Sequence, residues 1–266
     1  MGSGDGASRN LGRGPNFQLE RLDPEDADPG NLSFSLKRYQ FARSLVARKV
    51  VLDAGCGTGY GCSLLADDAS FVVGVDYDAD VLGHARRKYP AGNLDFVATT
   101  ITELPFDAAT FDVVVNFEVI EHLPDHEAHL VLFSEVRRVL KADGLFVIST
   151  SNRSVTVPHQ KSVGITVDAH LTEMDLKTFR SELEREFAVE FFGGMRYDGN
   201  KTYRVLRSLD IRNLRLMLPP KFREFIAQSL FGVNRRIRTG ANVIIEPSQL
   251  HQAAHFLAIC RNRVAV

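Results

Sequence analysis

Near-continuous apolar runs recur along the first 150 residues and are typical of buried parallel strands. They end at Asp53, Asp76, Phe96–Val97, Asn116 and Thr150. A parallel sheet covered by helices on both faces requires such runs, because neither face meets water. Patterns with helical periodicity separate the runs, at 33–47, 60–68, 79–88 and 126–141. This alternation predicts βαβ units and therefore an α/β fold.

The second half of the chain continues the pattern less regularly. Thr172-Glu173-Met174-Asp175 has the form of a capping box, which predicts a helix through about Glu184. The apolar runs 187–192 and 255–260 then predict the last two strands. Between them, 193–250 is expected to be a helical cap or insertion, opened by Gly193-Gly194 and interrupted at Pro219-Pro220.

The domain organisation follows from these elements and from composition. Residues 1–30 are rich in Gly, Asp, Asn and Pro, and we expect this segment to be mostly disordered. Residues 31–192 and 251–266 are expected to form the core, and 193–250 the insertion.

The first apolar run leads into a loop with glycine at alternate positions, Gly55-x-Gly57-x-Gly59, directly after Asp53. Glycine lets the backbone adopt positive φ and approach a ligand closely. The dinucleotide fingerprint G-x-G-x-x-G would need a third glycine where Tyr60 stands, and the chain has no phosphate-binding P-loop motif. The carboxylate of Asp53 suits a cationic group better than a phosphate. A nucleoside with an ammonium and a sulfonium, S-adenosylmethionine, therefore fits this loop best.

With these residues the chain resembles the class I S-adenosylmethionine-dependent methyltransferases. The resemblance covers roughly 33–192 and a terminal strand near 254–261. It rests on four ordered motifs, Val51–Gly59, Val72–Asp76, Leu104-Pro105-Phe106 with Phe111–Val115, and Glu135–Leu145. It implies a Rossmann-like, seven-stranded, mostly parallel sheet with helices on both faces and an antiparallel last strand.

The resemblance also implies the residues that hold the cofactor. Gly55, Gly57 and Gly59 would line the methionyl part and the ribose, and Asp53 would orient the ammonium. Asp76 would accept two hydrogen bonds from the ribose diol; the alternative, an N-cap for the helix at 79–88, suits Asp78 better. Tyr77 would pack on the adenine, and Asn116 would lie near the sulfonium. Many relatives place an acid-small pair before the Leu-Pro-Phe turn, where this chain has Thr100-Ile101; Thr100 or a backbone group would then replace the acid at the adenine.

A second cluster follows the fourth predicted strand, where Glu118, Glu121 and His122 stand three and four residues apart. If a helix or turn begins there, these side chains share one side. The run resembles that of ubiquinone-pathway O-methyltransferases and small-RNA 2′-O-methyltransferases, where it is a metal site. Carboxylates and histidines equally often cap and brace a helix, and we do not favour a metal here. His122 is also a candidate base or acceptor contact.

The region after the fifth strand carries the preferred catalytic candidate. Ser151-Asn152-Arg153 and the loop to His170-Leu171-Thr172-Glu173 resemble a pattern in bacterial sugar- and polysaccharide-cluster methyltransferases. There the histidine precedes the helix that opens near the acceptor site, which makes His170 our candidate base and Asn152 a further site candidate. The alternative is that His170 is structural or exposed to solvent.

Composition and net charge exclude only a few classes of function and location. The 266 residues carry a net charge of −1, which gives no general attraction to nucleic acid or anionic membranes. Three cysteines without metal-type spacing favour a reduced, cytoplasmic protein, and no apolar run reaches the ~18 residues that span a bilayer. The expected insertion is basic, which suits a solvated cap or homodimer contact, or a cover over a phosphorylated, nucleotide-linked or lipid-linked substrate.

The sequence thus predicts a methyltransferase that methylates an oxygen of a small polar acceptor, such as a sugar or natural-product hydroxyl. One alternative is metal-assisted methylation of an RNA 3′ end or a lipid-linked intermediate. Another is a non-catalytic, cofactor-binding subunit. A dehydrogenase is disfavoured by the missing third glycine.

Overall fold

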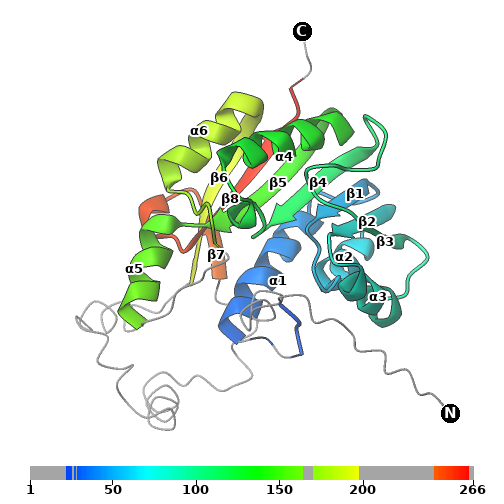
Figure 1. The fold of residues 1–266 in the computed structure, drawn as a ribbon, viewed down its shortest axis with the longest axis horizontal. Coiled ribbons are helices and arrows are strands. Elements are labelled where there is room, and N and C mark those ends of the chain that lie inside the picture. Colours follow the sequence, from blue (N-terminus) through cyan, green and yellow to red (C-terminus); the bar gives the residue numbers. More distant parts are fainter. Residues whose placement is uncertain (1–21, 26, 28, 164–169, 198–242, 264–266) are drawn as a thin grey trace, which may run out of the picture.

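The structure, a computed structural model, describes residues 22–25, 27, 29–163, 170–197 and 243–263. Its centre is one mixed sheet with the strand order β3-β2-β1-β4-β5-β8-β6-β7 (Figure 1). The strands are β1 (Val50–Ala54), β2 (Phe71–Asp76), β3 (Leu94–Ala98), β4 (Phe111–Phe117), β5 (Leu140–Ser151), β6 (Ala188–Tyr197), β7 (Val243–Glu246) and β8 (His255–Arg261).

The first five strands are parallel, and β8 pairs antiparallel with both β5 and β6. The expected Rossmann-like α/β fold is therefore confirmed. In detail it differs, because the seven expected strands are joined by an eighth, β7, antiparallel to β6.

Helices connect and cover these strands. They are α1 (Pro29–Arg43), α2 (Tyr60–Ala66), α3 (Ala79–Lys88), α4 (His126–Val139), α5 (Arg153–Val163) and α6 (Leu176–Glu186), with the short 3₁₀ helices η1 (Ile120–His122) and η4 (Leu250–Gln252). Asp78 caps α3, as predicted, by accepting hydrogen bonds from the backbone of Asp80 and Val81.

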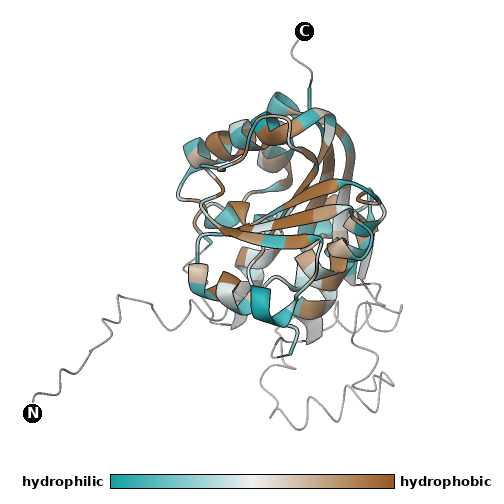
Figure 2. Ribbon diagram, turned by 90° about the vertical axis from the view of Figure 1, so that its right-hand side faces the viewer, coloured by the Kyte–Doolittle hydropathy of each residue, from teal (hydrophilic) through white to brown (hydrophobic). Residues whose placement is uncertain are grey.

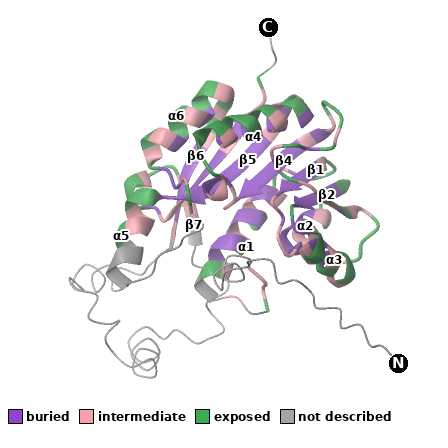
Figure 3. Cartoon of the chain, in the orientation of Figure 1, coloured by how far each residue is buried: buried purple, intermediate pink, exposed green. Residues whose placement is uncertain are grey.

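Alternation along each strand divides the core into two layers. On β1, Leu52 packs among side chains of α4 and α6, whereas Val51 packs among those of α1, α2 and α3. On β5, Phe146 and Val147 divide in the same way. Side chains two apart share a face of a strand, so Asp53 lies on the α1–α3 side with Val51. The strands are brown in Figure 2 and purple in Figure 3, because both faces of the sheet are apolar and buried.

The ends of the expected insertion are strands and not helices. β6 continues through Gly193 and Gly194, and both glycines are buried. A Cβ on Gly194 would lie 2.5 Å from the Cβ of Ala253, so glycine there admits the close approach of the chain after η4. Most of the expected cap, 198–242, lies outside the described residues, and its helical character stays a prediction.

Two helix boundaries also differ from expectation. α1 begins at Pro29, inside the segment expected to be mostly disordered, and Asp23 forms an ion pair with Lys88 of α3. α6 begins after Asp175, whose carboxylate accepts from the backbone N–H of Thr178. Thr172 therefore is not the N-cap that the capping-box pattern predicted.

We searched the described residues for a membrane-spanning helix and found none of sufficient length and apolar character.

Candidate functional site

The glycine loop connects β1 to α2 at the carboxyl edge of the parallel strands. Gly55, Gly57 and Gly59 all have positive φ, at 90°, 52° and 82°. A Cβ on Gly55 would lie 2.5 Å from a methyl carbon of Val119, which brings the start of η1 against the loop. A Cβ on Gly57 would meet no atom within 4 Å, so the loop faces open space there. The loop therefore has both the required conformation and room for a ligand.

Two predicted cofactor residues present unpaired oxygen atoms next to this loop. Asp53 is fully buried, and its Oδ2 accepts from the Tyr39 hydroxyl at 3.0 Å and the Cys62 thiol at 3.2 Å. Asn116 donates from Nδ2 to the backbone oxygen of Ala54 at 2.7 Å. Within the described part of the chain, Asp53 Oδ1 and Asn116 Oδ1 have no hydrogen-bond partner. Buried acceptors left unpaired fit a ligand that brings its own donors or positive charge.

The surroundings of Asp53 shift the pKa of its carboxyl group. Burial raises its pKa to about 6, although the hydrogen bonds from Cys62 and Tyr39 oppose the shift. A cationic group beside Oδ1 would favour the ionised form. The chemistry of this residue thus suits an ammonium better than an anion.

Asp76 lies at the end of β2, and its carboxylate accepts a hydrogen bond from the backbone of the glycine loop. Its Oδ2 accepts from the backbone N–H of Gly57 at 3.1 Å, and its Oδ1 accepts from that of Asp78 at 3.1 Å. The neighbouring Tyr77 is 63% exposed. An exposed aromatic ring beside a buried carboxylate fits the predicted recognition of adenine and ribose.

The residues that replace the acid-small pair lie in the turn after β3. The Thr100 hydroxyl is 2.6 Å from that of Thr102 and accepts from the Thr102 backbone at 3.1 Å. Ile101 is buried in the core layer with α4 and α6. Thr100 is thus engaged locally, and its contact with a cofactor stays a prediction.

The carboxylate of Glu118 pairs with two residues outside the cluster predicted for it. Its backbone φ is 56°, which turns the chain directly after β4. The carboxylate forms an ion pair with the buried Arg38 of α1 at 3.0 Å and contacts His255 Nδ1 at 2.7 Å. Burial opposes its ionisation, but the charges of Arg38 and His255 outweigh this and hold the pKa of Glu118 well below its usual range.

Glu121 is buried beside Glu118, and its pKa is shifted in the opposite direction. It accepts from the Thr150 hydroxyl at 2.9 Å and the Ser151 hydroxyl at 3.4 Å. Burial and the negative charge of Glu118 raise the pKa of Glu121 well above its usual range. The Ser151 hydroxyl also lies 3.2 Å from Glu118, so one hydroxyl, with a single proton, bridges the two carboxyl groups.

His170 lies against this cluster and is oriented by a carboxylate. Its Nδ1 is 2.5 Å from Glu173 Oε1, and its ring meets that of His122 edge to face at a centroid distance of 5.0 Å. Burial disfavours the imidazolium, but the Glu173 hydrogen bond and the surrounding acidic side chains, Glu121 among them, outweigh it and raise the pKa of His170. Donor atoms of Glu121, His122 and His170 lie within 4.8 Å of one another, a spacing that could hold a metal ion. Two of the three metal candidates that the sequence offered, Glu121 and His122, belong to this group, and the third member is His170 and not Glu118.

Asn152 has a structural position. Its Nδ2 donates to the backbone oxygen of Ala253 at 2.8 Å, and its Oδ1 accepts from the backbone of Ser154 at 3.0 Å. Both polar ends of the side chain are therefore occupied.

Sequence reasoning missed four partners in the site, namely Arg38, Tyr39, Glu173 and His255. Arg38 and Tyr39 come from α1, outside the family motifs, and are only 4% and 5% exposed. Their burial is a property of the fold, and the sequence shows only an arginine and a tyrosine in a segment with helical periodicity. His255 lies 137 residues from Glu118 in the chain, and no local pattern could pair them.

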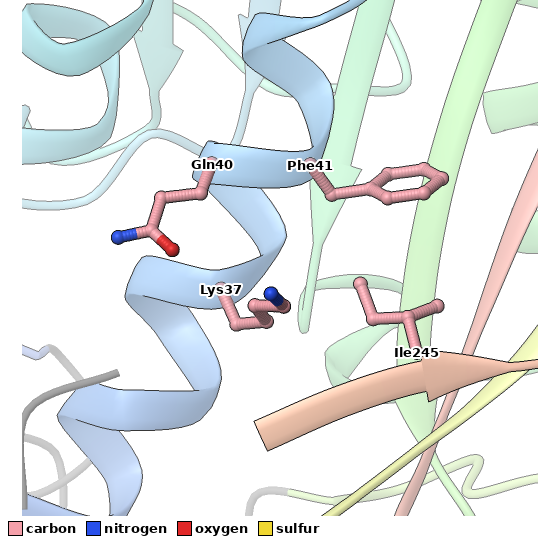
Figure 4. Close-up of a pocket in the computed structure, with 4 residues that line it drawn as sticks. All are labelled: Lys37, Gln40, Phe41 and Ile245. Atoms are coloured by element: carbon pink, nitrogen blue, oxygen red, sulfur yellow. The ribbon is translucent and has the colours of Figure 1, made fainter. Parts of the chain in front are cut away.

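A cavity of about 290 Å³ lies between α1 and β7, lined by Lys37, Gln40, Phe41 and Ile245 (Figure 4). Phe41 and Ile245 project into the space between the two elements. The glycine loop contributes no lining residue, and neither do Glu121, His122 and His170, so we assign this cavity no role in the site.

Comparison with known proteins agrees with this geometry. Residues 52–148 match a family model described as a methyltransferase domain. The chain is 47% identical over 120 residues to a Mycolicibacterium smegmatis protein named "probable S-adenosylmethionine-dependent methyltransferase", covering 45% of each chain. It is 30% identical over 172 residues to the fatty-acid O-methyltransferase of the same organism, covering 61% of each. The N-methyltransferase NodS of Bradyrhizobium japonicum shares the fold, with a TM-score of 0.56 and 15% identity over 90% of this chain and 99% of that one.

This chain spans less than two thirds of the length of those curated relatives. The resemblance inferred from the four motifs is nevertheless confirmed.

Proposed function

Because residues 52–148 form a class I S-adenosylmethionine-dependent methyltransferase domain, we propose that this protein methylates an oxygen atom of a small polar acceptor. The observation that carries the acceptor side is the His170–Glu173 pair beside η1. The observation that supports the donor side is the pair of unpaired oxygens at the glycine loop.

The chain's residues suit each part of the cofactor. Asp53 and Asn116 offer acceptor oxygens, and the glycine loop provides backbone without side chains at its open side. Asp76 is placed to exchange or share its backbone hydrogen bonds with a ribose diol. When bound, S-adenosylmethionine supplies a methyl group that its sulfonium already activates. The protein's contribution is to hold an acceptor in line and to exclude water, which is worth ~7–11 kcal/mol.

Cofactor affinity is expected to fall in acid because of Asp53. Its pKa is raised to about 6 by burial, so the carboxyl group becomes neutral below that pH and loses its attraction for an ammonium. Binding of S-adenosylhomocysteine, measured by calorimetry from pH 5 to 8, should be constant above about pH 7 and weaken below 6. Asp53→Asn should bind more weakly at pH 8 and lose this pH dependence. An unchanged acid limb in the variant would assign the titration to another group.

His170 is proposed as the general base. Its Nδ1 is held by Glu173, which fixes the tautomer and leaves Nε2 available for an acceptor hydroxyl. Glu173 itself accepts from the Thr156 hydroxyl at 2.7 Å, so its orientation is fixed in turn. A base that orients and deprotonates a hydroxyl suits methylation at oxygen, since a hydroxyl is weakly nucleophilic until its proton leaves.

The names of relatives support an oxygen acceptor. The Mycolicibacterium smegmatis relative is a fatty-acid O-methyltransferase. Ubiquinone biosynthesis O-methyltransferases, such as that of Glaesserella parasuis at 34% identity over 113 residues, also match. We infer a hydroxyl of a small polar molecule, such as a sugar or natural product, as the acceptor.

A screen with methyl-labelled S-adenosylmethionine tests this proposal. The full chain is incubated with separate panels of sugars, phenols and fatty acids, and the labelled products are identified by mass spectrometry. Label in an ether of a sugar or phenol supports the proposal. Label only in an amine, or no turnover while S-adenosylhomocysteine still binds, would contradict it, and the second result would favour a non-catalytic subunit.

On an acceptor found in this way, the base has a clear pH signature. Activity should rise with pH through a pKa above 6.5, because the imidazole must be neutral to accept a proton and Glu173 raises its pKa. His170→Ala should lower kcat by about 100-fold or more, within the range for general-base catalysis. Glu173→Gln should lower kcat less and shift the inflection to lower pH, whereas the exposed Glu127→Gln should change neither.

The same variants test the metal alternative, which the spacing of Glu121, His122 and His170 favours. In that mechanism His170 is a ligand, and a chelator abolishes activity that a divalent cation restores. Chelator-sensitive activity would therefore contradict the base assignment. Basic residues of the expected insertion, which suggested RNA or lipid-linked acceptors, lie mainly outside the described residues; Arg196 is described and pairs with Glu246 at 2.6 Å. A homodimer through that segment also stays a prediction.

A further inference from the structure

A second group of histidines lies between α4 and α6, separate from the catalytic cluster of Glu121, His122 and His170. His126 and His129 stand three apart at the start of α4 and project toward Glu182 of α6. His126 Nδ1 is 2.6 Å from Glu182 Oε1, and His129 Nδ1 is 3.0 Å from Glu182 Oε2. One carboxylate thus faces the same ring nitrogen of two imidazoles. Figure 1 shows α4 and α6 side by side on the same face of the sheet.

The second ring nitrogen of His129 contacts a threonine hydroxyl, and this contact bears on which ring nitrogen carries the proton. Nε2 is 2.9 Å from the Thr172 hydroxyl. That hydroxyl has one proton and lies within reach of three backbone oxygens, of Ile120, Glu121 and Leu123. When the hydroxyl donates to one of these carbonyls, Thr172 accepts from His129, and Nε2 carries the ring proton.

In that tautomer a lone pair points from Nδ1 of a neutral His129 at the Glu182 carboxylate. Two lone pairs at 3.0 Å repel unless a positive charge lies between them. A divalent cation would provide that charge with both imidazoles neutral.

We propose that His126, His129 and Glu182 form a binding site for a transition-metal cation of the Zn²⁺ class. Two imidazoles and one carboxylate are a ligand set that such ions prefer, and their donor atoms lie within 4.8 Å of one another. The hydrogen bond from His129 to Thr172 is the outer contact that orients a metal-binding imidazole. His126 is 62% exposed, which leaves an entry path and a position for water.

Such a site would fasten α6 to α4 and, through Thr172, to η1. The Thr172 backbone also donates to the Glu121 oxygen at 3.1 Å, and His170 lies two residues away. Metal binding at this site would therefore order the loop that carries the proposed base, from outside the reaction centre.

Calorimetric titration of the metal-stripped full chain with Zn²⁺ tests the proposal, with Co²⁺ absorption as a second reporter. We expect micromolar affinity, intense visible bands for a tetrahedral Co²⁺ site, and a melting temperature raised by about 5 °C at saturating Zn²⁺. His126→Ala and Glu182→Gln should each weaken this binding about tenfold or more. His126 is exposed, so its variant is expected to fold.

Two controls separate this site from the others. His84→Ala removes an exposed histidine of α3, and Glu121→Gln alters the catalytic cluster; both should leave this binding unchanged within about twofold. The proposal is overturned if Zn²⁺ binds more weakly than about 100 μM, or if Glu121→Gln abolishes binding while His126→Ala does not. Neither result would bear on S-adenosylhomocysteine affinity, which tests the proposed function separately.

Discussion

Replacing Asp76 with alanine is expected to weaken binding of S-adenosylhomocysteine by about 100-fold or more. We propose that the carboxylate accepts two hydrogen bonds from the ribose diol of the ligand, and each bond to a charged group is worth about 1.5–3 kcal/mol. The substitution also removes the acceptors for the backbone N–H groups of Gly57 and Asp78, so the loop loses its support. Calorimetry at pH 8, where the Asp53 carboxyl group is ionised, measures the effect.

Asp80→Ala is the matched control. Asp80 lies four residues further on, in the first turn of α3, and is exposed. The variant loses the same charge, so a general electrostatic effect would appear in both. Affinity within about twofold of wild type is expected for Asp80→Ala. Asp76→Ala with less than a tenfold loss would remove Asp76 from the cofactor site, provided that both variants melt as folded proteins.

A single methyl group at position 61 is expected to destabilise the fold by about 3 kcal/mol. Gly61 lies in α2 directly against α1, and a Cβ there would lie 1.9 Å from Cζ of Tyr39. The ring cannot move aside easily, because it packs edge to face against Tyr60 and Phe117 and its hydroxyl is bound to Asp53. Overpacking of this kind exceeds the gain of up to ~1 kcal/mol in helix propensity from glycine to alanine. Urea unfolding at 25 °C measures the difference.

Gly83→Ala provides the comparison within another helix. A Cβ on Gly83 would meet only Arg87 Nη1, at 3.6 Å, so this variant should be as stable as wild type or more so. In the background Tyr39→Leu, which removes the ring, Gly61→Ala should cost much less than in wild type. Equal costs in the two backgrounds would show that the clash with Tyr39 is not the cause.

The sheet and the glycine loop were predictable because their signals are local. Each buried strand is a continuous apolar run, and positive φ at Gly55, Gly57 and Gly59 follows from alternating glycines between a strand and a helix. The cap at Asp78 was predictable for the same reason. β7 was not, because a four-residue edge strand is short and its pairing with β6 depends on a distant segment.

The acidic cluster was predicted only in part, and backbone geometry explains the difference. The prediction assumed helical spacing from Glu118 to His122, but the chain turns at Glu118, which sends this carboxylate toward Arg38 and His255. Glu121 remains near His122 and His170. Similarly, Thr172 is occupied by His129 and the carbonyls of η1, so it cannot cap α6, and Glu173 pairs with His170 instead of completing a capping box.

The contacts of α1 decide how short a working fragment of this protein can be. A fragment trimmed to the matched segment, 52–148, would lack Tyr39 and Arg38. It would also expose to water the side chains of the core layer that α1 covers. Asp53 would lose a donor, and Glu118 would lose its buried cation. An expressible unit that retains the proposed cofactor site should therefore begin before Pro29, although the match to the family model begins only at Leu52. Boundaries drawn from similarity alone would cut through the electrostatic support of the cofactor site.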